Sequence, residues 1–222
     1  MTATWFHTPR ALRGWLYDRL VAGMTTDWYR EVLSRLPDGA RVLDVGIGTG
    51  AAMARCADLV RVKKLRVVGL DIDADYLERC RVEMARAGLS DQVSPVLSSV
   101  YDHCGGSYDA VYFSASLMLL SDPVAAIAHV ATQLTPGGRL FCTQTFHHHR
   151  SALLERAKPM IRHLTTIHFG RVTYEDEFRL AFDDAGVELV ELVAMSGTRW
   201  SSSRLAVAKL PDHGDRRGRM AA

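Results

Sequence analysis

The segment RVLDVGIGTGAA, residues 41–52, decides the fold of this chain. An apolar run ends in it, and three glycines follow at alternate positions: Gly46, Gly48 and Gly50. Glycine adopts positive φ readily and lets a ligand approach the backbone closely, so the segment predicts a buried strand, a tight turn and a helix start. Gly46, Gly48 and Ala51 fit the G-x-G-x-x-G/A turn of dinucleotide-binding proteins. The three glycines also fit a second pattern, D-x-G-x-G-x-G, which begins at Asp44.

Composition limits the choice of protein class. The 222 residues suffice for one α/β domain, and a net charge of +2 is too small for a nucleic-acid specialist. Four cysteines occur without a C-x-x-C pair, which indicates reduced thiols in a cytoplasmic protein rather than zinc ligands or disulfides. No apolar run reaches the length of a membrane span. We therefore expect neither a nucleic-acid nor a membrane partner.

Strand and helix patterns alternate through the middle of the chain. Strands are predicted over residues 40–46, 65–71, 92–98, 108–116 and 137–145, with helices over 50–59, 73–88 and 122–134. Such alternation predicts a parallel, doubly wound sheet that helices cover on both faces.

The two ends of the chain depart from this alternation. Residues 10–36 carry apolar residues at helical spacing, with a break at 22–27 that predicts two helices. Helices are expected over 151–164 and from Thr173, and then two strands, 187–195 and 203–210, follow each other directly. The short connection between them is of hairpin length, so we expect the last strand to be antiparallel.

The charge of Asp44 separates the two nucleotide classes. A dinucleotide places its pyrophosphate against the glycine turn, where a nearby buried carboxylate is unfavourable. S-adenosylmethionine (SAM) has no phosphate and carries a cationic sulfonium and ammonium, which suit an acid in this position. Asp71, at the end of the second strand, can accept hydrogen bonds from the ribose of either cofactor, or it can cap the following helix.

Four motifs in this order carry a family resemblance: VLDVGIGTG, VVGLDID, YDAVYFS and LTPGGRL. Together they resemble the class I SAM-dependent methyltransferases over about residues 40–210. The resemblance implies a doubly wound, Rossmann-like sheet of seven strands, mostly parallel with an antiparallel last strand, plus amino-terminal helices. It also implies SAM as the cofactor.

The same resemblance implies a set of cofactor-binding residues. Those expected around the methionine part are Asp44, Gly46, Gly48 and Gly50. Asp71 is expected on the ribose hydroxyls, Ile72 on the adenine face and Ser114 near the transferred methyl. Many members place an acid after the third strand to meet the adenine amino group, but this chain has Ser99 there. That contact stays open between Ser99, Val100 and Asp102.

The resemblance also divides the chain into three parts. Residues 1–36 are expected to form a helical lid over the cofactor, with Tyr17 among the aromatic side chains that line it. Trp28 and Tyr29 are expected either on this lid or as packing residues between helices. Residues 37–211 form the SAM-binding domain, and residues 212–222 are expected to be a flexible tail.

The acceptor is less clearly indicated. Methyltransferases of nucleic-acid bases share an N/D/S-P-P-aromatic motif after the fourth strand, and FSASLMLL, residues 113–120, lacks it. We therefore expect a small-molecule acceptor, methylated on oxygen, nitrogen or carbon. Three alternatives remain: a protein or RNA methyltransferase, an NAD(P)-dependent oxidoreductase on the same glycine loop, and an inactive partner subunit.

Three consecutive histidines follow the fifth strand in TFHHHRS, residues 145–151. In extended chain His147 and His149 share a side, at the end of the sheet where ligands bind. The near-neutral pKa of histidine suits a general base or an acceptor contact, and we place this role on His147 or His149. A polar loop without chemistry is the alternative. A metal site is not expected, because carboxylate or cysteine partners at ligand spacing are missing.

Overall fold

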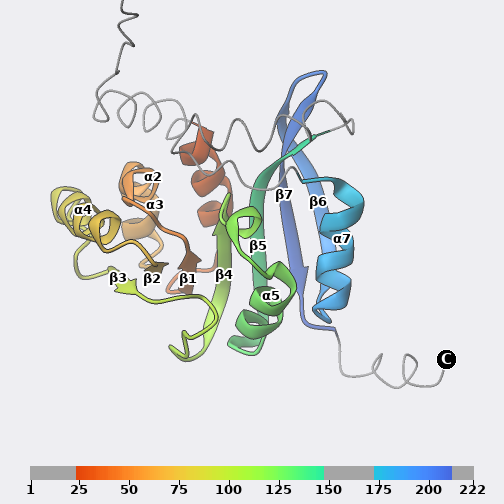
Figure 1. Cartoon of the computed structure of the whole chain (residues 1–222). Helices are drawn as coiled ribbons and strands as arrows, with labels where there is room; N and C mark the ends of the chain where they lie inside the picture. Colours follow the sequence, from red (N-terminus) through yellow and green to blue (C-terminus); the bar gives the residue numbers. More distant parts are fainter. Residues whose placement is uncertain (1–23, 148–172, 212–222) are drawn as a thin grey trace, which may run out of the picture.

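The computed structural model describes residues 24–147 and 173–211, and for His147 the backbone alone. These residues form one seven-stranded sheet in the order β3-β2-β1-β4-β5-β7-β6 (Figure 1). The strands are β1 (Arg41–Val45), β2 (Arg66–Asp71), β3 (Val93–Leu97), β4 (Tyr108–Ser114), β5 (Leu134–His147), β6 (Glu188–Gly197) and β7 (Ser201–Lys209). β1 to β5 run parallel, and β7 pairs antiparallel with both β5 and β6.

Helices cover both faces of this sheet (Figure 1). The helix over residues 24–35 packs on one face with α2 (Ala51–Arg55), α3 (Ala57–Val62) and α4 (Ala74–Arg86). The other face carries α5 (Pro123–Ala131) and α7 (Glu175–Asp184), and the short 3-10 helix η1 (Leu117–Leu119) contributes to the same core. Each face therefore has its own apolar core, as expected for a doubly wound sheet.

The predicted fold class is confirmed, including the antiparallel last strand. Pro95 lies in the edge strand β3, where a missing backbone donor is tolerated. Asp122 caps α5 by accepting a hydrogen bond from Ala125 N (2.9 Å), and Pro123 occupies the first turn, as the sequence predicts. None of the helices within the described ranges is long and apolar enough to cross a bilayer.

Several predicted boundaries were wrong. The helix expected over 50–59 is interrupted at Cys56, whose φ of −104° and ψ of 19° are not helical. Residues 24–27 are helical rather than a break. β5 runs on to His147 because β7 continues to pair with it, and α7 begins at Glu175 because Thr173 bridges to Phe146. The helix expected over 151–164 and the tail 212–222 lie outside the described residues.

Candidate functional site

The glycine loop connects the carboxyl end of β1 to α2. The backbone N–H groups of Gly46 and Ile47 both donate to Leu70 O, at 2.8 and 3.0 Å, which ties the loop to the end of β2. Ser116, just beyond β4, donates its hydroxyl to Val45 O on the other side. The loop therefore lies at the edge where β1, β2 and β4 end, the place where open α/β sheets bind ligands.

The three glycines of the loop all have left-handed backbone, with φ of 82°, 59° and 70° at Gly46, Gly48 and Gly50. A Cβ on Gly50 would lie 2.6 Å from Cys80 Sγ and 2.9 Å from Met84 Cε, so this glycine permits close packing of α4. A Cβ on Gly48 would meet no protein atom within 4 Å. Gly48 thus presents bare backbone to open space, a surface that a ligand can approach closely.

Asp71 is the last residue of β2 and contacts the glycine loop. One carboxylate oxygen accepts from Gly48 N (2.9 Å) and the other from Asp73 N (3.0 Å). Each oxygen can accept a further hydrogen bond, which is what a ribose diol requires. Helix α4 is capped by Asp73, whose Oδ1 accepts from Asp75 N and Tyr76 N. Capping of α4 therefore does not explain Asp71.

The predicted adenine-binding residues follow β2 and β3, two strands whose ends pair at Asp71 and Leu97. Ile72 is 79% exposed and Leu97, at the end of β3, is 58% exposed, so two apolar side chains stand in the open beside the acid. Ser99 accepts from Tyr101 N at 3.3 Å, and Asp102 is exposed. The side chain of Val100 is buried in the core, which leaves its backbone as the part available to a ligand.

Asp44 is fully buried in β1, two residues before the turn. Its Oδ2 accepts from the Tyr29 hydroxyl at 2.7 Å, whereas its Oδ1 is buried with no partner. The pKa of Asp44 is raised to about 7, chiefly because burial disfavours the charged form; the Tyr29 hydrogen bond lowers the pKa, and the negative charge of Asp71 raises it. An unpartnered oxygen on a buried acid is costly unless a ligand donor meets it.

Tyr29 was missed by sequence reasoning as a partner of Asp44. Only 3% of its surface is exposed, and Trp28 beside it is 2% exposed, so both aromatic residues pack in the core. The sequence carries no signal for the pair, because the two residues are 15 positions apart in different elements. Their contact depends on how the helix over residues 24–35 crosses the sheet.

The end of β4 is locally strained. Ser114 pairs with Thr143 of β5, and Ala115, which follows it, has a φ of 54°. Such backbone is unfavourable for a residue with a Cβ and is found preferentially at functional sites. Ala115 N donates to Thr143 O at 2.8 Å, which holds the strained turn in place. The predicted methyl-transfer position, Ser114, is therefore next to rigid backbone.

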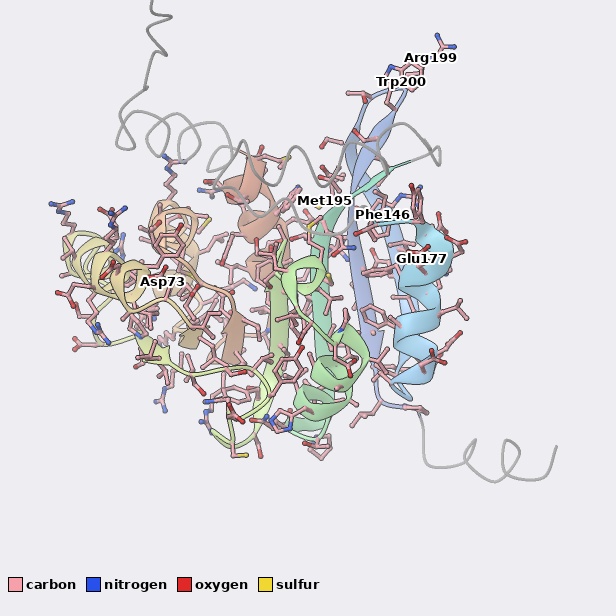
Figure 2. The ribbon with its side chains drawn as sticks, viewed as in Figure 1. Asp73, Phe146, Glu177, Met195, Arg199 and Trp200 are labelled. Atoms are coloured by element: carbon pink, nitrogen blue, oxygen red, sulfur yellow. The ribbon has the colours of Figure 1, made fainter. Side chains whose placement is uncertain are left out.

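Three strands extend beyond this point. β5 continues from Gln144 to His147 past its last pair with β4, and the β6–β7 hairpin continues alongside it. Figure 2 shows Arg199 and Trp200 at the tip of the hairpin and Phe146 nearer the sheet. The guanidinium of Arg204 lies over the Phe146 ring (5.3 Å to its centroid) and donates to Glu175 of α7. We name residues 144–147 and 194–204 the arm.

Several predicted residues are not placed. His147 is the last residue of β5 and pairs with Ser201, but its side chain is not described. His149 and Tyr17 lie outside the described residues, as does most of the predicted lid. The structure thus brings together the predicted cofactor-binding residues Asp44, Gly46, Gly48, Gly50, Asp71, Ile72 and Ser114 at one edge of the sheet.

Comparison with known proteins agrees with this geometry. Residues 42–138 match the family model described as "Methyltransferase domain". Over residues 42–138 the chain is similar to SAM-dependent methyltransferases. The matched segment contains the glycine loop, Asp71 and the turn after β4, and it ends as β5 begins.

Individual curated relatives are similar to this chain over part of their length. Aklanonic acid methyltransferase DauC of Streptomyces sp. (strain C5) is 34% identical over 130 residues, which cover 57% of this chain and 59% of DauC. The ubiquinone biosynthesis O-methyltransferase of Xanthomonas axonopodis pv. citri (strain 306) is 36% identical over 108 residues, 47% of this chain and 43% of the relative. The chain spans about half the length of the curated relatives it matches.

Among solved structures, the mitomycin 7-O-methyltransferase MmcR has the same fold, with a TM-score of 0.69. It is 18% identical, and the match covers 91% of this chain and 58% of MmcR. At that identity the likeness concerns the fold, which by itself does not fix an activity.

Proposed function

We propose that the protein transfers a methyl group from SAM to a small-molecule acceptor in the cytoplasm. The observation that carries the proposal is the buried Asp44 beside the glycine turn, with one oxygen unpartnered. A cationic ligand group satisfies that oxygen, whereas a diphosphate would be repelled by it. The same charge argues against the NAD(P)-dependent alternative.

The residues of the carboxyl edge fit SAM part by part. Asp44 and the bare backbone at Gly48 would hold the methionine end, and Asp71 would accept from the ribose hydroxyls. Ile72 would lie against the adenine, with Ser99 or the backbone of Val100 at its rim. Bound SAM supplies an electrophilic methyl group. The protein's contribution is to align the acceptor with that methyl and to exclude water.

The acceptor site is proposed to lie between the turn after β4 and the arm. Ser114 stands at one side, and the arm carries hydroxyls such as Thr145 and Ser203, whose oxygens are 3.5 Å apart. Relatives named as methyltransferases of aklanonic acid and of ubiquinone biosynthesis support a small organic acceptor. We propose His147, the last residue of β5, or His149, two residues later in the sequence, as a base for acceptors that must lose a proton.

Substitution of Asp71 tests the cofactor site. Asp71→Ala removes both ribose acceptors, so S-adenosylhomocysteine should bind more weakly by about 1.5–3 kcal/mol, the value of hydrogen bonds to a charged group. Calorimetric titration measures this loss. The matched control is Asp73→Ala, which removes the α4 cap two residues away and should lower stability by about 1 kcal/mol with little change in affinity. Unchanged affinity in folded Asp71→Ala would refute the assignment.

Transfer of a labelled methyl group tests the activity itself. Purified protein, labelled SAM and fractionated metabolite extracts should give a labelled small product, and label in protein or RNA would favour those alternatives instead. Each of His147→Ala and His149→Ala is then assayed on that product. The variant that removes the base should lose about 10²–10⁴-fold in turnover with little loss of SAM affinity. Wild-type turnover in both variants would remove the proposed role.

A further inference from the structure

The hydrogen bond between Tyr29 and Asp44 joins the helix over residues 24–35 to the cofactor strand β1. Its O···O distance is 2.7 Å and both side chains are buried. The Tyr29 ring is fixed by Tyr112 of β4, with ring centroids 5.0 Å apart and planes at 81°, an edge-to-face contact. Tyr112 in turn is hydrogen-bonded through its hydroxyl to Thr143 Oγ1 at 2.7 Å. Tyr29 is therefore held in one orientation by β4 and β5.

The surroundings of Asp44 contain acids and neutral donors. The groups that face it are Tyr29 from the helix over residues 24–35, Asp71 from β2, Cys80 from α4 and Tyr112 from β4. Within residues 24–147 and 173–211, no cation contributes to the charge state of Asp44. The Tyr29 hydroxyl is thus the group among these that favours the ionised carboxylate, because a hydrogen bond to a charged form stabilises it.

We propose that Tyr29 is a positioning residue for the methyl donor: its hydroxyl holds Asp44 Oδ2 so that an ionised carboxylate presents Oδ1 to the donor's ammonium. This inference rests on the proposed function. The donor's ammonium and the Tyr29 hydroxyl then give each oxygen of the buried carboxylate a partner. A buried carboxylate is stable only when both of its oxygens are partnered. Ligand binding at the sheet edge is thereby coupled to the packing of the helix over residues 24–35.

The coupling has a characteristic dependence on pH. Below its pKa of about 7, Asp44 must lose a proton before it can pair with the ammonium, so donor affinity should fall as the pH falls. Tyr29→Phe keeps the ring and removes the hydrogen bond that lowers the pKa of Asp44. The pH at which affinity levels off should then move upward. The affinity deficit of the variant should be largest at low pH and should shrink as the pH rises.

Calorimetric titration with S-adenosylhomocysteine at pH 6, 7, 8 and 9 tests the proposal on the full chain. Between pH 6 and pH 8 the wild-type affinity should rise about tenfold relative to the affinity of Asp44→Asn at the same pH. The Asp44→Asn variant reports the titration of the ligand itself. Tyr29→Phe should bind about tenfold more weakly than wild type at pH 6, with the deficit narrowing by pH 9. Urea unfolding of each variant checks that it is folded.

Tyr112→Phe is the matched control, because it also removes one buried tyrosine hydroxyl, but one bonded to Thr143. It should leave the pH profile of binding in place. A Tyr29→Phe deficit that is absent or equal at all pH values, or an identical profile in Tyr112→Phe, would overturn the role of Tyr29 while leaving the SAM site intact. Failure of the wild-type protein to bind S-adenosylhomocysteine at any pH would instead overturn the proposed function, and this inference with it.

Discussion

The two ends of the parallel strands differ in how their buried polar groups are satisfied. We call the end where these strands begin the amino edge, and the end where they finish, next to the glycine loop, the carboxyl edge. At the amino edge, Asp109 accepts from Arg41 N (2.8 Å) and from Thr135 Oγ1 (3.0 Å), so both carboxylate oxygens are partnered. Nearby, His103 Nε2 and the Tyr108 hydroxyl lie 2.8 Å apart. The unpartnered buried atom among the described groups at this edge is Gln133 Oε1, which belongs to a neutral amide.

At the carboxyl edge, the unpartnered buried atom is an oxygen of an acid, Asp44 Oδ1. Exposed Ile72 and strained Ala115 accompany it. At the amino edge protein groups thus satisfy most of the buried polar atoms, whereas the carboxyl edge leaves a buried acid oxygen and an exposed apolar side chain that the proposed SAM would meet. Under the proposed function, stability and ligand binding are therefore assigned to opposite ends of the same strands.

The largest effect is expected when one aspartate at each edge is replaced by asparagine, beginning with Asp44 at the carboxyl edge. Between pH 3.8 and about 7 the folded chain binds a proton at Asp44 that the unfolded chain releases. The contribution of Asp44 to stability is therefore complete below pH 3.8 and is lost as the pH rises to 7. Asp44→Asn removes this loss, so its stability relative to wild type should increase by about 2–3 kcal/mol from pH 5 to pH 8. Urea unfolding at the two pH values measures it.

Asp109→Asn is the counterpart at the amino edge. Asp109→Asn disturbs two hydrogen bonds without a compensating gain in stability. It should therefore lower the free energy of unfolding by about 1–3 kcal/mol at both pH values. Affinity for S-adenosylhomocysteine should stay the same. Destabilisation by Asp44→Asn that is equal at pH 5 and pH 8 would break the contrast between the edges.

A smaller effect is expected from relief of backbone strain. Ala115 has a φ of 54° at the carboxyl edge, and Lys64, just before β2, has a φ of 51° at the amino edge. Glycine at either position removes the strain but makes the unfolded chain more flexible, so each variant should gain at most about 1 kcal/mol of stability. Only Ala115→Gly should also weaken S-adenosylhomocysteine binding, because it loosens the turn beside Ser114. Equal binding in both variants would show that the strain has no functional role.

Sequence patterns were sufficient for most of the half of the molecule that carries the glycine loop, except for the interruption of the helix at Cys56. Strand β1, helix α4 and the cap at Asp122 are fixed by local signals: apolar runs, a glycine turn and a proline after an acid. The family model matches this half too, from residue 42 to 138. The hairpin of β6 and β7 was also predictable, because its connection is too short for a helix.

The remainder depended on contacts between distant parts of the chain. The length of β5 is set by pairing with β7, and the start of α7 by the bridge from Thr173 to Phe146. The partner of Asp44 depends on the path of the helix over residues 24–35, which periodicity predicts to be amphipathic but does not orient. Sequence reasoning predicted a role for Asp44 but did not find Tyr29, whose hydroxyl donates to it.

The central claim is that the carboxyl edge accepts a cationic methyl donor rather than a dinucleotide. Calorimetric titration of the wild-type protein at pH 8 with SAM, S-adenosylhomocysteine, NAD⁺ and NADP⁺ tests it most directly. We predict saturable one-to-one binding of SAM and S-adenosylhomocysteine and no measurable heat of binding from either dinucleotide. Binding of NAD⁺ or NADP⁺ with no binding of SAM would contradict the account.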